Sequence, residues 1–117
     1  NCVQVFRTGE GLQRTVTILS DLRTRYDGTA VRAGGRVFNL DLLRVLELDG
    51  MIDLALATAM GALARQESRG AHSRADFPLR DDANWLRHTL AYHTDQGPRL
   101  GYKPVVVDQF QPQDRTY

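Results

Sequence analysis

The stretch LDLLRVLELDGMIDLALATAMGALARQE (residues 40–67) decides the fold of this chain. Leucine and alanine dominate it, and both residues have high helix propensity. Asn39, directly before the stretch, is a good N-cap residue. Apolar positions cover more than half of the helix circumference, and small residues such as Ala59 and Gly61 allow close contact with a neighbouring helix. We therefore predict one long central helix at residues 40–67, which can kink at Gly50 and has its C-terminal stop at Gly70.

A second helix is predicted upstream, at about residues 8–27. Thr8 is suited to capping the first-turn amides, and Glu10 suits the positive end of the helix dipole. Gly28 ends this helix, and the glycine-containing stretch GTAVRAGGRVF (residues 28–38) is a connecting loop. Three- and four-residue spacing places one apolar face on the helix, formed by Leu12, Val16, Leu19, Leu22 and Tyr26.

Downstream of the long helix the pattern changes to aromatic and β-branched residues. The runs WLRHTLAYH (residues 85–93) and LGYKPVVVDQF (residues 100–110) flank a turn that contains Gly97 and Pro98. This pattern predicts a β-hairpin at about residues 86–109, with Pro104 at a strand edge or start. The fold class is thus mainly α, a helical bundle followed by a small antiparallel β-hairpin and an irregular C-terminal tail. Residues 1–117 are expected to form a single domain.

Composition excludes several classes of protein. The net charge of +1 over 117 residues generates no global field that would attract nucleic acid or anionic lipid. Cys2 is the single cysteine, so no internal disulfide can form, which fits a reducing compartment. No apolar run approaches the ~20 residues that span a bilayer, and the N-terminus does not resemble a signal peptide. We expect neither a nucleic-acid partner nor direct membrane insertion.

The stretch ESRGAHSRADFPLRDD (residues 67–82), here named the charged cluster, concentrates the chemistry of the chain. Ser68, His72 and Asp76 could share a helix face as a nucleophile triad, but Gly70 and Pro78 argue against a helix there. Interleaved arginines and carboxylates cancel the field that a nucleic-acid patch needs. Two interpretations stay open from the residues alone: a self-paired charged loop, and a docking surface built from bidentate arginine–carboxylate pairs.

Metal and nucleotide sites are not predicted. The three histidines, at positions 72, 88 and 93, do not form a zinc pattern with Cys2. The segment RAGGR (residues 32–36) lacks the GxGxxG spacing and the strand–turn–helix context of a phosphate-binding loop.

Residues 37–92 resemble the C-terminal helical domain of the succinate dehydrogenase flavoprotein subunit, which fumarate reductase shares. The family pattern A-x-A-R-x-E-S-R-G-A-H-x-R, followed by D-[FY]-P-x-R-D-D-x-N-W-x-x-H-T-L, is similar to residues 62–90 with few departures. L-Aspartate oxidase shares the ESRG-x-H portion and looks less similar from RDDANWLRHTL (residues 80–90) onward. The resemblance extends to NCVQVFRTGEGL (residues 1–12), and it implies a three-helix bundle whose first helix is truncated at NCVQVF (residues 1–6).

The resemblance implies a parent enzyme that oxidises succinate to fumarate with covalently bound FAD. Such a parent passes electrons to an iron–sulfur subunit, as a cytoplasmic, peripheral protein at the inner face of the cell membrane. The family's catalytic and flavin-binding residues lie upstream of this domain, so we assign no catalytic, cofactor-binding or metal residue here. The chain is expected to be an excised, catalytically inert domain.

Its expected partners are the flavin-binding domain of the same chain and the iron–sulfur subunit. The alternatives are a domain of fumarate reductase or of L-aspartate oxidase, and a free-standing helical interaction module. For docking between domains, we assign a set of residues from the charged cluster: Arg69, His72, Arg74, Asp76, Arg80 and Asp81.

Overall fold

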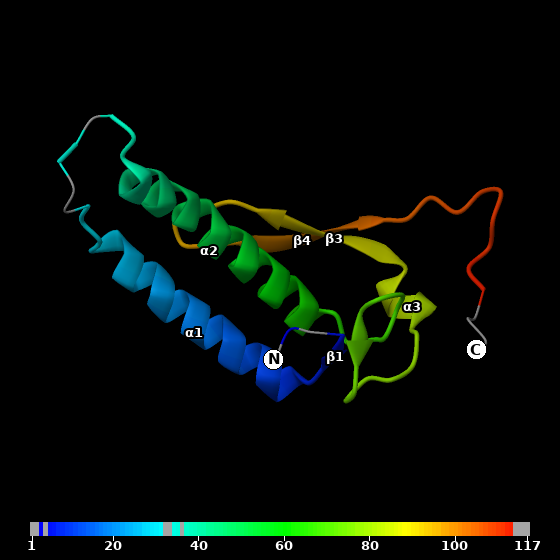
Figure 1. The fold of residues 1–117 in the computed structure, drawn as a ribbon. Helices are drawn as coiled ribbons and strands as arrows, with labels where there is room; N and C mark the ends of the chain where they lie inside the picture. The colour runs from blue at the N-terminus through cyan, green and yellow to red at the C-terminus, as the bar shows by residue number, and fades with distance from the viewer. Residues whose placement is uncertain (1–2, 4, 32–33, 36, 114–117) are drawn as a thin grey trace.

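Two long antiparallel helices lie side by side, and a β-hairpin crosses one of them (Figure 1). The computed structural model describes residues 3, 5–31, 34–35 and 37–113, and spans 57 Å along its longest axis. The mainly helical fold with an antiparallel hairpin confirms the predicted fold class. The elements in chain order are β1 (Phe6–Arg7), α1 (Gly9–Asp27), α2 (Leu40–Ala64), β2 (Ser73–Arg74), α3 (Asp82–Trp85), β3 (Arg87–Tyr92) and β4 (Arg99–Pro104).

Helix α1 begins and ends where its capping residues place it. The Thr8 hydroxyl accepts a hydrogen bond from the Gly11 amide at 3.1 Å, which satisfies one orphan donor of the first turn. Gly28 follows the last turn, and its amide bonds back to the carbonyl of Arg25. Of the apolar face only Leu12 is fully buried, so α1 contributes most to the core near its N-terminal end.

Helix α2 is continuous through Gly50 and has a core at one end only. Asn39 caps it, its side-chain oxygen accepting from the Leu42 amide at 2.9 Å. The buried residues of α2 all lie between its midpoint and its C-terminal end: Ile52, Leu56, Ala59 and Ala62. Toward the N-terminal end the apolar side chains are open to solvent, with Leu40 58% exposed and Leu43 50% exposed.

The C-terminal end of α2 differs from the prediction. The helix ends at Ala64, three residues before the expected position 67, and Arg65 is already extended with ψ of 106°. Gly70 is not a helix stop. With φ of +58°, it lies in a tight turn that joins Arg69 to His72 by two backbone hydrogen bonds. Glycine adopts this left-handed backbone without the steric penalty of a side chain.

The hairpin pairs β3 with β4 in antiparallel register, from Arg87 opposite Pro104 to Tyr92 opposite Arg99. Gly97, with φ of +99°, lies in the connecting turn. Strand β4 ends at Pro104, which has no amide hydrogen, so the hairpin is shorter than the predicted 86–109. The tail that follows contains no helix or strand over residues 105–113, the described part.

Strands β1 and β2 form a short parallel pair that no local pattern predicted. Phe6 pairs with Ser73 and Arg7 with Arg74, which brings the N-terminal segment beside the charged cluster. The expected remnant of a first helix at residues 1–6 is not seen in the described residues, because Val3 lies in a turn and Phe6 is in β1. The third helix is instead the one-turn α3, which follows the charged cluster. Cys2 and residues 114–117 lie outside the described residues.

Candidate functional site

Glu67 is the buried centre of the charged cluster. Its side chain has 0% exposure. It accepts one hydrogen bond from Arg65, through Nη1, and two from Arg69, through Nε and Nη2. The Asp81 amide donates a further bond to Oε2 at 2.9 Å. Burial alone raises the pKa of Glu67, but the bonds from Arg69, the Asp81 amide and Arg65 outweigh it, and the pKa is lowered. A buried carboxylate with four donors joins Arg65, just before the cluster, to Arg69 and Asp81 within it.

Arg74 closes the C-terminal end of α2. It is 2% exposed, and its Nη1 donates to the carbonyl oxygens of Ala62, Leu63 and Arg65 at 3.0–3.1 Å. The last carbonyls of a helix have no intrahelical partner and need donors from elsewhere. The positive guanidinium also suits the negative end of the helix dipole. Arg74 therefore explains why α2 ends at Ala64.

Asp76 connects this arginine to the start of α1. Its carboxylate receives a bidentate pair from Arg74, at 2.8 and 2.7 Å, and a hydrogen bond from the Gly9 amide at 3.0 Å. The bonds from Arg74 are the largest cause that holds the pKa of Asp76 well below its ordinary range. An acidic group at a helix N-terminus is favourable for the dipole as well. The Arg74–Asp76 pair thus caps the C-terminal end of α2 and the N-terminal end of α1.

This close approach predicts that Gly9→Ala destabilises the domain. A Cβ at position 9 would lie 2.9 Å from Asp76 Oδ2 and 3.0 Å from Arg74 Nη2, so the bidentate pair would have to shift. We expect a net loss of about 0.5–2 kcal/mol in the free energy of unfolding, because the overpacking cost is partly offset by the gain of about 0.5–1 kcal/mol that alanine has over glycine in a helix, measured by urea unfolding of the 117-residue chain. Gly50→Ala is the control, because open space surrounds that position in α2, and it should gain about 0.5–1 kcal/mol. Equal stability of Gly9→Ala and the parent sequence would show that the pair yields freely.

His72 bridges β1 and the end of α2 as a neutral imidazole. Arg7 Nη1 donates to His72 Nδ1 at 2.7 Å, which leaves Nε2 as the protonated nitrogen, 3.3 Å from the Arg65 carbonyl oxygen. Burial is the largest cause that lowers the pKa of His72, and the charges of Arg7, Arg74 and Arg65 act in the same direction. The ring is an orienting contact between segments, since both of its nitrogens have partners.

The last part of the cluster builds the short helix α3 and reaches the tail. Asp81 caps α3 through the Asn84 amide at 3.0 Å. Asp82 accepts from Arg69 and from Arg80, whose Nη2 lies 3.1 Å from Asp82 Oδ2. Arg80 Nη1 also donates to the carbonyl oxygen of Gln113. These contacts fix α3 on the cluster and hold part of the tail beside it.

The arrangement does not assemble a nucleophile with a general base. Ser68 Oγ accepts from the Arg74 amide at 2.8 Å and donates to the Phe77 carbonyl at 2.8 Å, so its hydroxyl is used within the loop. His72 and Asp76 have other partners, as described above, and the three residues form no chain of hydrogen bonds. Within residues 3, 5–31, 34–35 and 37–113, no group of three histidine, cysteine or acidic side chains is placed to hold a metal ion.

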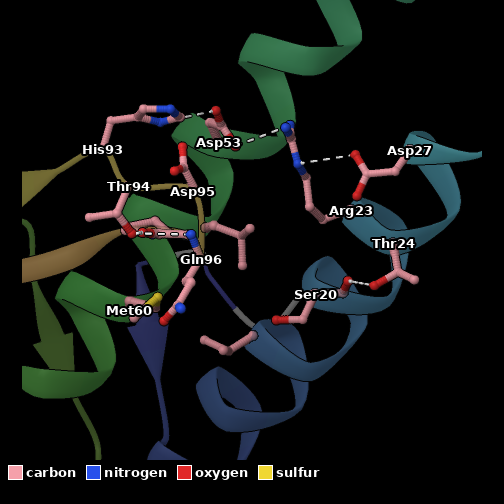
Figure 2. A pocket seen from close by; sticks show the side chains of 14 residues that line it. Ser20, Arg23, Thr24, Asp27, Asp53, Met60, His93, Thr94, Asp95 and Gln96 are labelled. Atoms are coloured by element: carbon pink, nitrogen blue, oxygen red, sulfur yellow. Dashed lines mark hydrogen bonds and ion pairs between the residues drawn. The ribbon is translucent and has the colours of Figure 1, made fainter.

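A cleft of about 620 Å³ lies between α1, α2 and the hairpin turn (Figure 2). Arg23 of α1 points across it and pairs with Asp27 at 3.8 Å, with Asp49, and with Asp53 of α2 at 3.2 Å. His93 from the hairpin lies 3.5 Å from the other oxygen of Asp53. The hydrogen bond to Asp49 is the main cause that raises the pKa of Arg23. Ion pairs of Arg23 therefore join the α1 and α2 walls of the cleft, and His93 of the hairpin approaches the same aspartate.

The six residues assigned to docking all have partners inside the chain. Arg74 alone among them is buried, while the side chains of Arg69 and Arg80 are 28% and 25% exposed. Glu67 and Arg65 were missed, although Glu67 is the centre of the cluster. The sequence pattern that could have predicted them is the alternation of charge at Arg65, Glu67 and Arg69, which lies where we expected the helix to end.

Fold and cluster together define a helical domain with a terminal hairpin, whose helix ends are clamped by arginine–carboxylate pairs. The family model described as "Fumarate reductase flavoprotein C-term" matches residues 1–117. The chain belongs to this family, the C-terminal region of succinate dehydrogenase and fumarate reductase flavoprotein subunits, which confirms the resemblance drawn from the sequence.

Relatives of both kinds are similar over most of the chain. The fumarate reductase flavoprotein subunit of Haemophilus influenzae is 40% identical over 114 residues, which cover 97% of this chain and 19% of that protein. The succinate dehydrogenase flavoprotein subunit of Rickettsia conorii is 42% identical over 104 residues, covering 88% of this chain and 17% of that protein. This chain spans about a fifth of the length of the curated relatives that it matches.

Solved structures show the same fold. A variant of E. coli quinol fumarate reductase matches with a TM-score of 0.89 and 38% identity, over 94% of this chain and 19% of that one. The Mycobacterium smegmatis Sdh1 complex matches with a TM-score of 0.71 and 31% identity, over 86% of this chain and 17% of that one. Among the described residues, no helix combines the length and the apolar character that crossing a membrane requires.

Proposed function

We propose that residues 1–117 are a non-catalytic docking domain of a flavoprotein that interconverts succinate and fumarate. In this proposal the parent chain holds FAD and passes electrons to an iron–sulfur subunit, as a peripheral protein at the cytoplasmic face of the membrane. The charged cluster is the observation that carries the proposal. Its buried charges and its serine and histidine are engaged in joining helix ends and loops, which is a positioning role.

The entry to α2 does not fit a phosphate-binding site for a flavin dinucleotide. Helix α2 is capped by the side chain of Asn39, and its entry contains the exposed residues Val37 and Phe38 instead of a phosphate-binding turn. No strand precedes α2 closely among the described residues, so the strand–turn–helix arrangement that approaches a pyrophosphate is missing there. We therefore assign FAD to the remainder of the parent chain.

The exposed apolar surface supports a docking role. Helix α2 presents Leu40, Leu43, Met51 and Leu54 with 50–71% exposure, and Leu79 of the charged cluster is 79% exposed. Contiguous apolar surface of this kind marks interaction sites in soluble proteins. In the proposal, α2 and the Phe77–Leu79 loop meet the flavin-binding part of the parent, and the cluster keeps these two surfaces in fixed relation.

The proposal is tested by expressing residues 1–117 and the rest of the parent flavoprotein as two separate chains, together with the partner subunits. We expect the two chains to copurify and to turn over succinate and fumarate, and neither chain alone to sustain turnover. Each preparation is also assayed with L-aspartate. Turnover of L-aspartate alone would replace the proposed activity by that of the relative, and turnover by residues 1–117 alone would refute the non-catalytic role.

A further inference from the structure

Arg87, the first residue of β3, is held in place by aromatic rings. Its Cζ lies 4.5 Å from the centroid of Trp85 and 3.9 Å from that of Tyr102. The two rings contact each other edge to face, with centroids 5.9 Å apart, and Trp85 is 8% exposed. Guanidinium groups stack well on aromatic faces, so the side chain is ordered before any partner arrives.

The charge of Arg87 has no acceptor within the described residues. Its Nε is buried and makes no hydrogen bond, and no ion pair to this guanidinium is found there. The carboxylates of the neighbouring cluster are already engaged. Glu67 accepts from Arg65, Arg69 and the Asp81 amide, and Asp82 accepts from Arg69 and Arg80. Unpaired polar groups that water cannot reach are costly, so a structure that retains one points to a missing partner.

Arg87 opens on a cleft of about 430 Å³ that no carboxylate lines. Arg65 and Arg69 form part of its wall, with His72 and His88, and the described lining residues include no aspartate or glutamate. Because Arg65 and Arg69 are paired with Glu67, Arg87 supplies the uncompensated positive charge. The cleft is suited to an anionic group that can form a planar, bidentate pair.

We propose that Arg87 receives an aspartate or glutamate carboxylate from the part of the parent flavoprotein chain outside residues 1–117. This inference rests on the proposed function, since it needs a parent chain that folds against this domain. The matched relatives are about five times as long, so most of the chain that could supply the carboxylate lies outside residues 1–117. Arginine, tryptophan and tyrosine in a half-buried pocket are the composition of an interface hot spot. The cluster positions the domain, and Arg87 supplies the specific polar contact.

Zero-length cross-linking of the full-length flavoprotein tests the proposal. In Arg87→Lys, a carbodiimide activates the partner carboxylate and the introduced amine displaces the urea, so that an amide bond joins the two residues. Arg99→Lys is the matched control, because Arg99 also stacks on a tyrosine, 4.7 Å from the Tyr92 centroid, but lies exposed at the other end of the hairpin. Peptide mapping should find a cross-link from position 87, and not from position 99, to an acidic residue outside residues 1–117.

A second measurement tests the same contact without Arg87→Lys, in case that variant folds poorly. Carbodiimide labelling with glycine ethyl ester compares the full-length parent with Arg87→Gln and Arg99→Gln, and the same acidic residue should gain label only in Arg87→Gln. The proposal is overturned if position 87 couples only within residues 1–117 or to another subunit, or if no outside carboxylate gains label. Neither readout measures turnover, so a parent that oxidises L-aspartate would refute the proposed activity and leave this contact intact.

Discussion

Arg74→Met will lower the free energy of unfolding by about 3–5 kcal/mol, because it leaves carbonyl oxygens at the end of α2 without a donor, and each such buried group costs about 1–3 kcal/mol. Methionine fills a similar volume but donates no hydrogen bonds. The carbonyls of Ala62, Leu63 and Arg65 then lose their shared donor, and Asp76 loses its bidentate partner. Because whole domains are stable by only about 5–15 kcal/mol, the change should be visible as a large shift in the urea midpoint.

Arg14→Met is the matched control for this experiment. Arg14 is exposed on α1 and takes part in no hydrogen bond or ion pair among the residues that the structure describes, so the same change there should stay within about 0.5 kcal/mol. Amide hydrogen exchange adds a local readout, since the Arg65 amide bonds to Gly61 in the last turn of α2 and should lose protection in Arg74→Met. A loss below about 1 kcal/mol would mean that water satisfies the three carbonyls and that Arg74 is not what ends α2.

The helices were predictable because their signals are local. Thr8, Gly28 and Asn39 act as caps within one turn of the residues that they cap, and the apolar spacing of α1 follows directly from helix geometry. The hairpin has a comparable local signal in Gly97 and the flanking aromatic residues. Local chemistry of this kind can be recognised without knowing what lies across the core.

The end of α2 could not be predicted in the same way. Residues 65–67, Arg-Gln-Glu, have good helix propensity, and nothing in them stops a helix. The helix stops because Arg74, nine residues further on, takes its terminal carbonyls. The β1–β2 pair is a similar case, since it joins residues 67 positions apart through a two-residue ladder that has no sequence pattern. Tertiary contacts overrode local preference in both places.

In the charged cluster, the residue types alone do not determine which side chains pair with each other. Its composition allowed both a self-paired loop and a docking surface, because an arginine in a sequence does not reveal which carboxylate it will meet. The structure pairs the six assigned residues internally, and it adds the unassigned Glu67, which bonds to Arg69 and to the Asp81 amide. In the proposed docking role, the contacts are made by neighbouring surfaces, the exposed face of α2 and the pocket of Arg87, and the cluster orients them.

Glu67→Gln should cost about as much as Arg74→Met, about 3–5 kcal/mol, because it removes the charge that compensates two arginines in a buried site. The amide keeps the size of the carboxylate, but one of its two ends becomes a donor that faces the donors of Arg65, Arg69 or the Asp81 amide. Glu47→Gln, on the exposed side of α2, makes the same chemical change without these partners and should remain within about 0.5 kcal/mol.

The pH dependence of unfolding separates the charge of Glu67 from its shape. The folded-state pKa of Glu67 is lowered from an ordinary value of 4.5, so the unfolded chain binds the proton first as the pH falls. The stabilisation is therefore complete above about pH 4.5 and is lost as the pH drops through the folded-state pKa. Urea unfolding between pH 7 and pH 3 should show a shallower acid loss in Glu67→Gln than in the parent sequence, with the slope from Asp76 remaining. Glu47→Gln should follow the parent curve. If Glu67→Gln retains the full acid slope, the buried carboxylate is not ionised in the folded state, and its arginine bonds are not what holds the cluster together.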